Sequence, residues 1–113
     1  MHLFKPIDEP SYVGVFHFYV KNSHIDEFKA AVEEVLPFSA SEEGVVEFQY
    51  LQDREDPTHF TFFDIYRDEA AYQVHLKMSY IARFGKRIAP MLQRSYEGSC
   101  YYLRGGYRNS SAS

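Results

Sequence analysis

The chain has 113 residues, 45% hydrophobic and 25% charged, so it has the size of one domain and enough apolar residues to bury a core. Its formal net charge is −4, with Lys and Arg scattered along the sequence, which excludes the basic surface that nucleic-acid binding requires. A single Cys, no signal-peptide pattern and no apolar run near the ~20 residues of a membrane span favour the cytoplasm and exclude a membrane partner.

The N-terminal part of the chain predicts a strand followed by a helix. Residues 12–20 are rich in aromatic and β-branched types, which favour a strand. Asn22 or Ser23 is expected to cap a helix, because apolar residues then recur at helical spacing up to about residue 36. Pro37 is expected to kink or end this helix.

The middle of the chain predicts a β-hairpin followed by a second helix. Strands are expected at residues 45–51 and 60–66, joined by a polar loop that contains a proline. The second helix is expected to open at Asp68, because apolar residues, most of them aromatic, then recur every four positions as far as Ile88. A break in this helix near Ser79 is an open alternative.

The C-terminal part predicts a last strand and a tail. Residues 99–103 favour a strand, and a pair of glycines ends it. We expect a single domain over residues 1–113, with an ordered core over about 10–104 and a flexible tail over 105–113.

The order of these elements predicts the fold class. The sequence β-α-β-β-α-β is typical of an α+β, ferredoxin-like domain, in which both helices lie on one face of an antiparallel sheet. The first strand is apolar on both sides, because Val13 and Val15 alternate with Phe16 and Phe18. One helical layer covers only one side, so we expect the sheet of a second subunit to cover the other side in a homodimer.

Five segments carry a family resemblance. They are GVVEFQY at 44–50, DREDP at 53–57, FTFFDIYRDEAAY at 60–72, HL at 75–76 and IAPML at 88–92. Together, in this order and spacing, they resemble the antibiotic biosynthesis monooxygenase family over roughly residues 12–104. The resemblance implies a ferredoxin-like unit whose dimers place two sheets against each other as a dimeric α+β barrel.

The family that the chain resembles has several activities. Members of the family include cofactor-independent monooxygenases of polyketide phenols and quinols, an isomerase of a phosphorylated signalling sugar, and haem-degrading oxygenases. The segment from His75 to Leu92 is also similar to that isomerase without gaps. The chain departs from the family at Tyr66, where Trp is frequent, and at Tyr80, where a second His occurs.

His75 is the first candidate catalytic residue. It lies one helical turn from Tyr72 and one from Ser79, so an imidazole and a phenol share one face of the second helix. With an ordinary pKa near ~6.5, it is a natural proton acceptor for a phenol or for a carbon next to a carbonyl. The alternative is a core histidine that is hydrogen-bonded to a neighbour; the resemblance favours the catalytic role.

Asp64 is the second candidate catalytic residue, because it interrupts an apolar strand where an unpaired charge would be costly. We expect it either to orient His75 or to form an ion pair with a Lys or Arg. Tyr66 shares its strand face. The resemblance implies that Tyr66 and Tyr72 line the pocket and bind substrate oxygens; filling of an aromatic core is the alternative.

Two further residues are candidates for substrate binding. His17 is the lone polar side chain within the first strand, and an interface or core histidine is the alternative. Arg87 lies near the end of the second helix, where the resemblance implies an arginine directed toward the substrate; a solvated charge is the alternative.

No cofactor or metal is predicted. The glycines within the predicted elements are isolated, so no Gly-rich turn suits a flavin or a nicotinamide, and no Cys/His spacing suits zinc. The haem-degrading branch needs a ligand His farther along the second helix, where this chain has residues 83–86, Arg-Phe-Gly-Lys.

These observations predict oxidation of an electron-rich phenol or quinol by O2. Removal of a substrate proton by His75 with Asp64, or by water that they position, would give an anion that reduces O2 directly within an aromatic pocket. Two alternatives stay open: an isomerase that acts on a hydroxy-ketone or sugar phosphate with the same base, and a non-catalytic dimer that binds aromatic metabolites.

Overall fold

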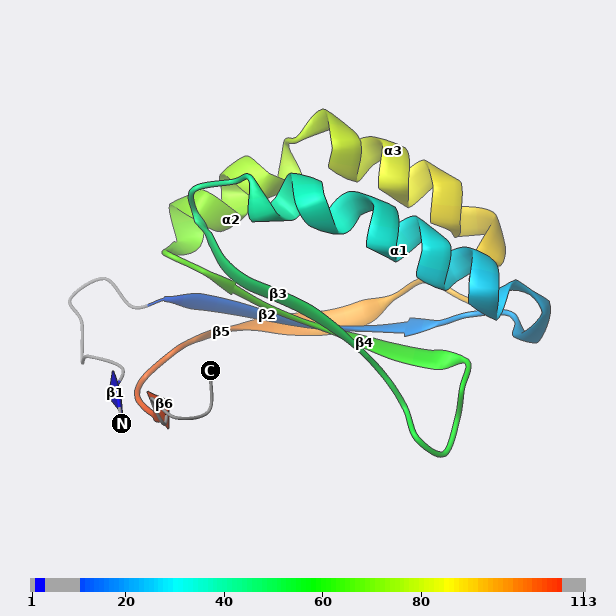
Figure 1. Ribbon diagram of the computed structural model, residues 1–113, viewed down its shortest axis with the longest axis horizontal. Coiled ribbons are helices and arrows are strands. Elements are labelled where there is room, and N and C mark those ends of the chain that lie inside the picture. Colours follow the sequence, from blue (N-terminus) through cyan, green and yellow to red (C-terminus); the bar gives the residue numbers. More distant parts are fainter. Residues whose placement is uncertain (1, 4–10, 109–113) are drawn as a thin grey trace.

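The computed structural model describes residues 2–3 and 11–108, and four of its strands build the main sheet (Figure 1). These strands are β2 (Tyr12–Tyr19), β3 (Val45–Gln52), β4 (His59–Tyr66) and β5 (Glu97–Tyr102). The helices are α1 (Ile25–Ala40), α2 (Glu69–Leu76) and α3 (Ser79–Ile88), with 3-10 turns at Asn22–His24 and Ala89–Met91. The two-residue strands β1 (His2–Leu3) and β6 (Tyr107–Arg108) pair separately.

The four strands form an antiparallel sheet in the order β3-β4-β2-β5. The register places Phe16 of β2 opposite Phe62 of β4, and Gly14 opposite Asp64. All three helices cover the same face of this sheet (Figure 1). The α+β, ferredoxin-like fold predicted from the sequence is therefore confirmed.

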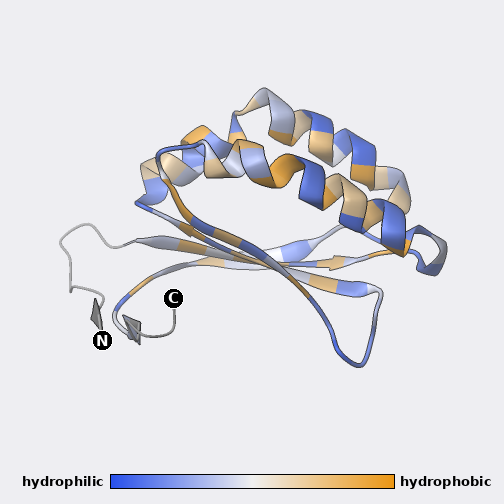
Figure 2. Ribbon diagram, viewed as in Figure 1, coloured by the Kyte–Doolittle hydropathy of each residue, from blue (hydrophilic) through white to orange (hydrophobic). Residues whose placement is uncertain are grey.

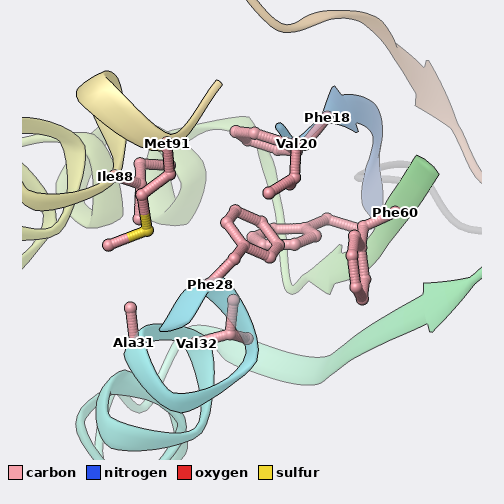
Figure 3. Packing of buried hydrophobic residues seen from close by; sticks show 9 residues of the cluster. Phe18, Val20, Phe28, Ala31, Val32, Phe60, Ile88 and Met91 are labelled. Carbon is pink, nitrogen blue, oxygen red and sulfur yellow. The ribbon is translucent and has the colours of Figure 1, made fainter. Parts of the chain in front are cut away.

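The hydrophobic core lies between α1 and the central strands. Phe28 of α1 is fully buried and packs against Phe60 and Phe18, with ring centroids 4.9 and 5.9 Å apart. Figure 3 shows how side chains from the strands, α1 and the end of α3 converge here. The buried cluster comprises Phe18, Val20, Phe28, Ala31, Val32, Phe60, Phe62, Ile88 and Met91.

The predicted hairpin and its polar loop are confirmed. The loop between β3 and β4 is hydrophilic (Figure 2) and is stabilised by Asp53, whose carboxylate accepts hydrogen bonds from the backbone N–H groups of Glu55 and Asp56. This Asx-type turn fixes the connection between the two strands.

The first helix differs from the prediction at both ends. Of the two outcomes expected at Pro37, a kink or an end, the end is wrong, because α1 continues to Ala40. Proline removes only one backbone hydrogen bond, whereas the last turn gains contacts with Tyr80: Phe38 stacks on its ring and Ser39 contacts its hydroxyl. Neither Asn22 nor Ser23 caps α1, because both belong to the 3-10 turn that precedes it.

The second predicted helix divides into two, as the alternative of a break near Ser79 proposed. Asp68 caps α2 by accepting a hydrogen bond from the N–H of Ala71. The extended backbone of Met78, with ψ of 136°, then separates α2 from α3. The break gives each helix its own orientation over the sheet.

The C-terminal strand begins earlier than predicted, at Glu97, and ends at Tyr102. Part of the predicted tail pairs instead: Tyr107 and Arg108 of β6 lie opposite Leu3 and His2. The rest of that predicted tail, residues 109–113, lies outside the described residues. Within residues 2–3 and 11–108, no helix is long and apolar enough to cross a membrane.

Candidate active site

A cavity of about 140 Å³ lies between the sheet and the helices. Alternate residues of the central strands form its floor, and inward-facing side chains of α1, α2 and α3 form its walls. It is lined by Phe16, Phe18, Val35, Phe48, Phe62, Asp64, Tyr66, Tyr72, His75, Leu76, Ile81, Phe84, Gly85, Ile88 and Tyr96. Apolar and aromatic walls with a few convergent polar groups are typical of a small-molecule site.

His75, at the end of α2, is held by a carboxylate. Its Nδ1 lies 2.7 Å from Oε2 of Glu42, and both side chains are buried. Because a carboxylate only accepts, Nδ1 carries the proton of this hydrogen bond. The other ring nitrogen, Nε2, has no hydrogen-bond partner among the described residues and is left with a free lone pair. An imidazole oriented in this way is arranged to accept a proton from a ligand in the cavity that it lines.

Through its hydrogen bonds, Glu42 connects the end of α1 with His75 of α2 and Tyr80 of α3. It lies in the loop between α1 and β3, and it also accepts a hydrogen bond from the hydroxyl of Tyr80 at the start of α3. Ser39 Oγ of α1 lies 2.9 Å from the same hydroxyl. Burial and the hydrogen bond to Glu42 raise the pKa of Tyr80, so it stays a neutral donor at physiological pH. These contacts fix the position of the carboxylate behind the imidazole.

Asp64 projects from β4 into the cavity and is only 3% exposed. The hydroxyl of Tyr66 donates to its Oδ2 at 3.2 Å, which confirms that these residues share a strand face. The second oxygen, Oδ1, is buried and has no partner among the described residues. Burial raises the pKa of Asp64 to about 7, although the bond from Tyr66 lowers it. A carboxyl group of this pKa can exchange a proton near neutrality.

Tyr66 and Tyr72 form the aromatic end of the cavity. Their rings meet edge to face with centroids 5.1 Å apart, and the Tyr72 ring stacks on Phe16 at 6.5 Å. Tyr66 also contacts the imidazole of His75, with centroids 5.2 Å apart. Burial raises the pKa of both phenols, so both remain protonated. The structure therefore brings His75, Asp64, Tyr66 and Tyr72 together in one cavity.

Comparison with known proteins assigns the family. The sequence matches the antibiotic biosynthesis monooxygenase family over residues 11–87, more than half of the chain. The chain belongs to this family. An uncharacterised protein of Synechocystis is 27% identical over 99 residues, which cover 88% of this chain and 67% of that protein.

Solved structures share the fold of this antibiotic biosynthesis monooxygenase family member. A Nitrosomonas europaea protein, named for the same family, has a TM-score of 0.81 and 23% identity, over 86% of this chain and 93% of its own. A conserved protein from Methanosarcina mazei has a TM-score of 0.80 and 19% identity, over 83% and 93%. A Shewanella oneidensis protein has a TM-score of 0.78 and 24% identity, over 86% and 94%.

Two predicted substrate-binding residues do not line this cavity. His17 lies on the sheet face away from the helices, where its Nδ1 is 2.9 Å from Nε2 of His59. Arg87 lies on the outer side of α3 and forms a 2.6 Å ion pair with Glu34 of α1. The structure therefore places neither side chain on the cavity that holds His75 and Asp64.

The expected partners of Asp64 also need correction. Its hydrogen bond comes from Tyr66 rather than from His75, and no Lys or Arg of the described residues forms an ion pair with it. The carboxylate that orients His75 is Glu42 instead. Sequence reasoning missed Glu42 because it lies in an acidic loop without periodicity, and nothing local distinguishes it from its neighbour Glu43.

Within residues 2–3 and 11–108, no group of three or more His, Cys, Asp or Glu side chains is arranged to hold a metal ion. The polar side chains that line the cavity of this family member are Asp64, Tyr66, Tyr72, His75 and Tyr96.

Proposed function

We propose that this protein is a cofactor-independent monooxygenase that oxidises an aromatic phenol or quinol with O2. The observation that carries the proposal is the placement of two proton acceptors, His75 and Asp64, on one aromatic cavity. Membership of a family named for monooxygenases supports the same conclusion.

The proposed reaction begins with proton removal. The substrate hydroxyl donates to Oδ1 of Asp64 or to Nε2 of His75, and the base accepts the proton while Glu42 stabilises the imidazolium. The resulting phenolate gives two electrons to O2 as a new C–O bond forms at a ring carbon that bears hydrogen, and the base returns its proton to the peroxide, which gives a hydroperoxide. Loss of water from the hydroperoxide leaves a quinone, so one oxygen atom enters the product and the other becomes water. The apolar walls favour this step because they exclude bulk water from the anion.

An oxygen-electrode assay tests this proposal. Purified protein is expected to consume O2 with at least one member of a panel of hydroquinones and dihydroxyphenols, and to yield one oxygenated product per O2. A conversion that proceeds at the same rate without O2 would support an isomerase instead. Binding of the panel with no conversion under either condition would support a binding protein.

The proposed enzyme is a homodimer. Large apolar side chains remain exposed on the sheet face away from the helices: Leu51 is 50%, Phe63 36% and Tyr101 54% exposed. A second sheet packed on this face would remove them from water, and stable interfaces are built from such patches.

Sedimentation tests the dimer. At micromolar concentration we expect twice the 13.3 kDa mass of the chain. Phe63→Lys should shift the equilibrium toward monomer, because it places a charge within the proposed interface. Val74→Lys is the matched control, since Val74 is 54% exposed on α2, away from that face. A wild-type protein that sediments as a stable monomer would refute the proposal.

A further inference from the structure

The volume of the cavity limits the size of its ligand. A dry apolar cavity of ~150 Å³ in another protein binds benzene, and the cavity described here measures about 140 Å³. It therefore has room for one aromatic ring with a small substituent. Two fused rings would exceed this volume, so the second ring would remain partly outside the cavity.

The polar groups of the cavity limit the charge of its ligand. No Lys or Arg lines it, and its charged group is the carboxyl of Asp64. Oδ1 of Asp64 is buried without a partner, and a buried acceptor in this state is costly until a donor reaches it. A ligand hydroxyl supplies that donor. A ligand carboxylate would be repelled by Asp64 and would find no cation within the walls.

We infer that the cavity binds an uncharged, single-ring hydroxyaromatic compound whose hydroxyl donates to Oδ1 of Asp64. This inference rests on the same site as the proposed function and narrows its substrate class from phenols and quinols in general to single-ring, neutral ones.

Gly85 leaves the rim of the cavity open. It lines the cavity from α3, and a Cβ atom at this position would meet no other atom within 4 Å. A larger side chain at position 85 would therefore stand in open space at the mouth. Tyr96 also lines the cavity, and its ring stacks on Phe18 with centroids 4.8 Å apart.

Titration calorimetry without O2 tests the inference, because binding is then measured apart from turnover. The probes are 4-methylphenol, toluene, 4-hydroxybenzoate and 2-naphthol, at about pH 8.5, where Asp64 with a pKa of about 7 is ionised. We expect 4-methylphenol to bind roughly 10- to 100-fold more tightly than toluene, which lacks the donor. The anionic 4-hydroxybenzoate and the two-ring 2-naphthol should each bind at least about tenfold more weakly than 4-methylphenol.

Two variants and one control test which residues determine the charge preference and the affinity of the cavity. Asp64→Asn should reduce the preference for 4-methylphenol over 4-hydroxybenzoate, because the repelling charge is removed. Gly85→Leu should weaken 4-methylphenol binding at least about tenfold, whereas Ala82→Leu, on the exposed side of the same helix, should leave it unchanged. Melting temperatures of both leucine variants establish that each is folded.

Equal affinity for toluene and 4-methylphenol, or tighter binding of 2-naphthol, would overturn the inference. Binding in the expected order with no O2 uptake would retain the inference and refute the proposed oxidation. O2 uptake with two-ring substrates alone would support the proposed oxidation and refute the inference.

Discussion

Replacement of His75 by alanine is expected to lower kcat by about 10²- to 10⁴-fold, the usual contribution of a positioned acid–base group. The reason is the pairing with Glu42 at 2.7 Å, which leaves Nε2 as the proton acceptor in the cavity. The measurement is kcat for the substrate found with the oxygen electrode, together with the denaturant midpoint. His75→Phe should give the same loss, because it fills the volume without restoring the base.

Two controls separate catalysis from stability. His24→Ala removes an imidazole that contacts Ser23 at the start of α1, outside the cavity, and should leave kcat unchanged. Glu42→Gln keeps an acceptor for His75 but removes the charge that stabilises the imidazolium, so it should lower kcat while KM changes little. A His75→Ala variant that loses about 1–3 kcal/mol of stability but keeps full activity would make His75 a structural residue.

Replacement of Asp64 by asparagine is expected to make the protein more stable at alkaline pH. Burial raises the pKa of Asp64 from 3.8 to about 7 in the folded state. Because the folded-state pKa is the higher one, the stability from the protonated carboxyl is complete below about pH 4 and is lost as pH rises toward 7. The full loss is on the order of 4 kcal/mol. Asp64→Asn should abolish it, because asparagine does not ionise.

Urea midpoints of both proteins at about pH 4 and pH 8 measure this effect. The free energy of unfolding should fall between these values in the wild type and fall much less in Asp64→Asn. Asp53→Asn is a control, because hydrogen bonds from the backbone of Glu55 and from His59 lower the pKa of Asp53 below 3.8. The stability that Asp53 contributes is lost only below about pH 4, so this variant should keep the wild-type change between pH 4 and pH 8. If the free energy of unfolding changes with pH equally in wild type and Asp64→Asn, ionisation of Asp64 costs little free energy in the folded state and the prediction is wrong.

The elements could be predicted because each shows its period in the sequence. Alternation along residues 60–66 places Asp64 and Tyr66 on one face, and the structure joins them by a hydrogen bond. The same alternation places His17 on the strand face of Val13 and Val15, and the structure agrees. It could not tell which face the helices would cover, so the proposed pocket role of His17 had no support from pattern alone.

The rest of the site depends on contacts between distant residues. Glu42 and His75 are 33 positions apart, and they meet because α1 runs one turn beyond Pro37 before the chain descends into β3. Rules based on neighbouring residues include the hydrogen bond that a proline removes from a helix. They do not include a contact between residues as far apart in the sequence as Ser39 and Tyr80. Because the sequence prediction ended the helix near residue 36, it missed both the true end of α1 and the contact between Glu42 and His75.

The break between α2 and α3 separates the proposed base from apolar residues that shape the cavity. His75 lies before Met78, whereas Ile81, Phe84 and Gly85 lie after it. In one continuous helix, an inserted residue would rotate everything beyond it by about 100°. With an extended residue at the joint, α3 can shift or change length while the imidazole keeps its place over β4. Evolution can therefore alter which molecules fit this cavity without rebuilding its base.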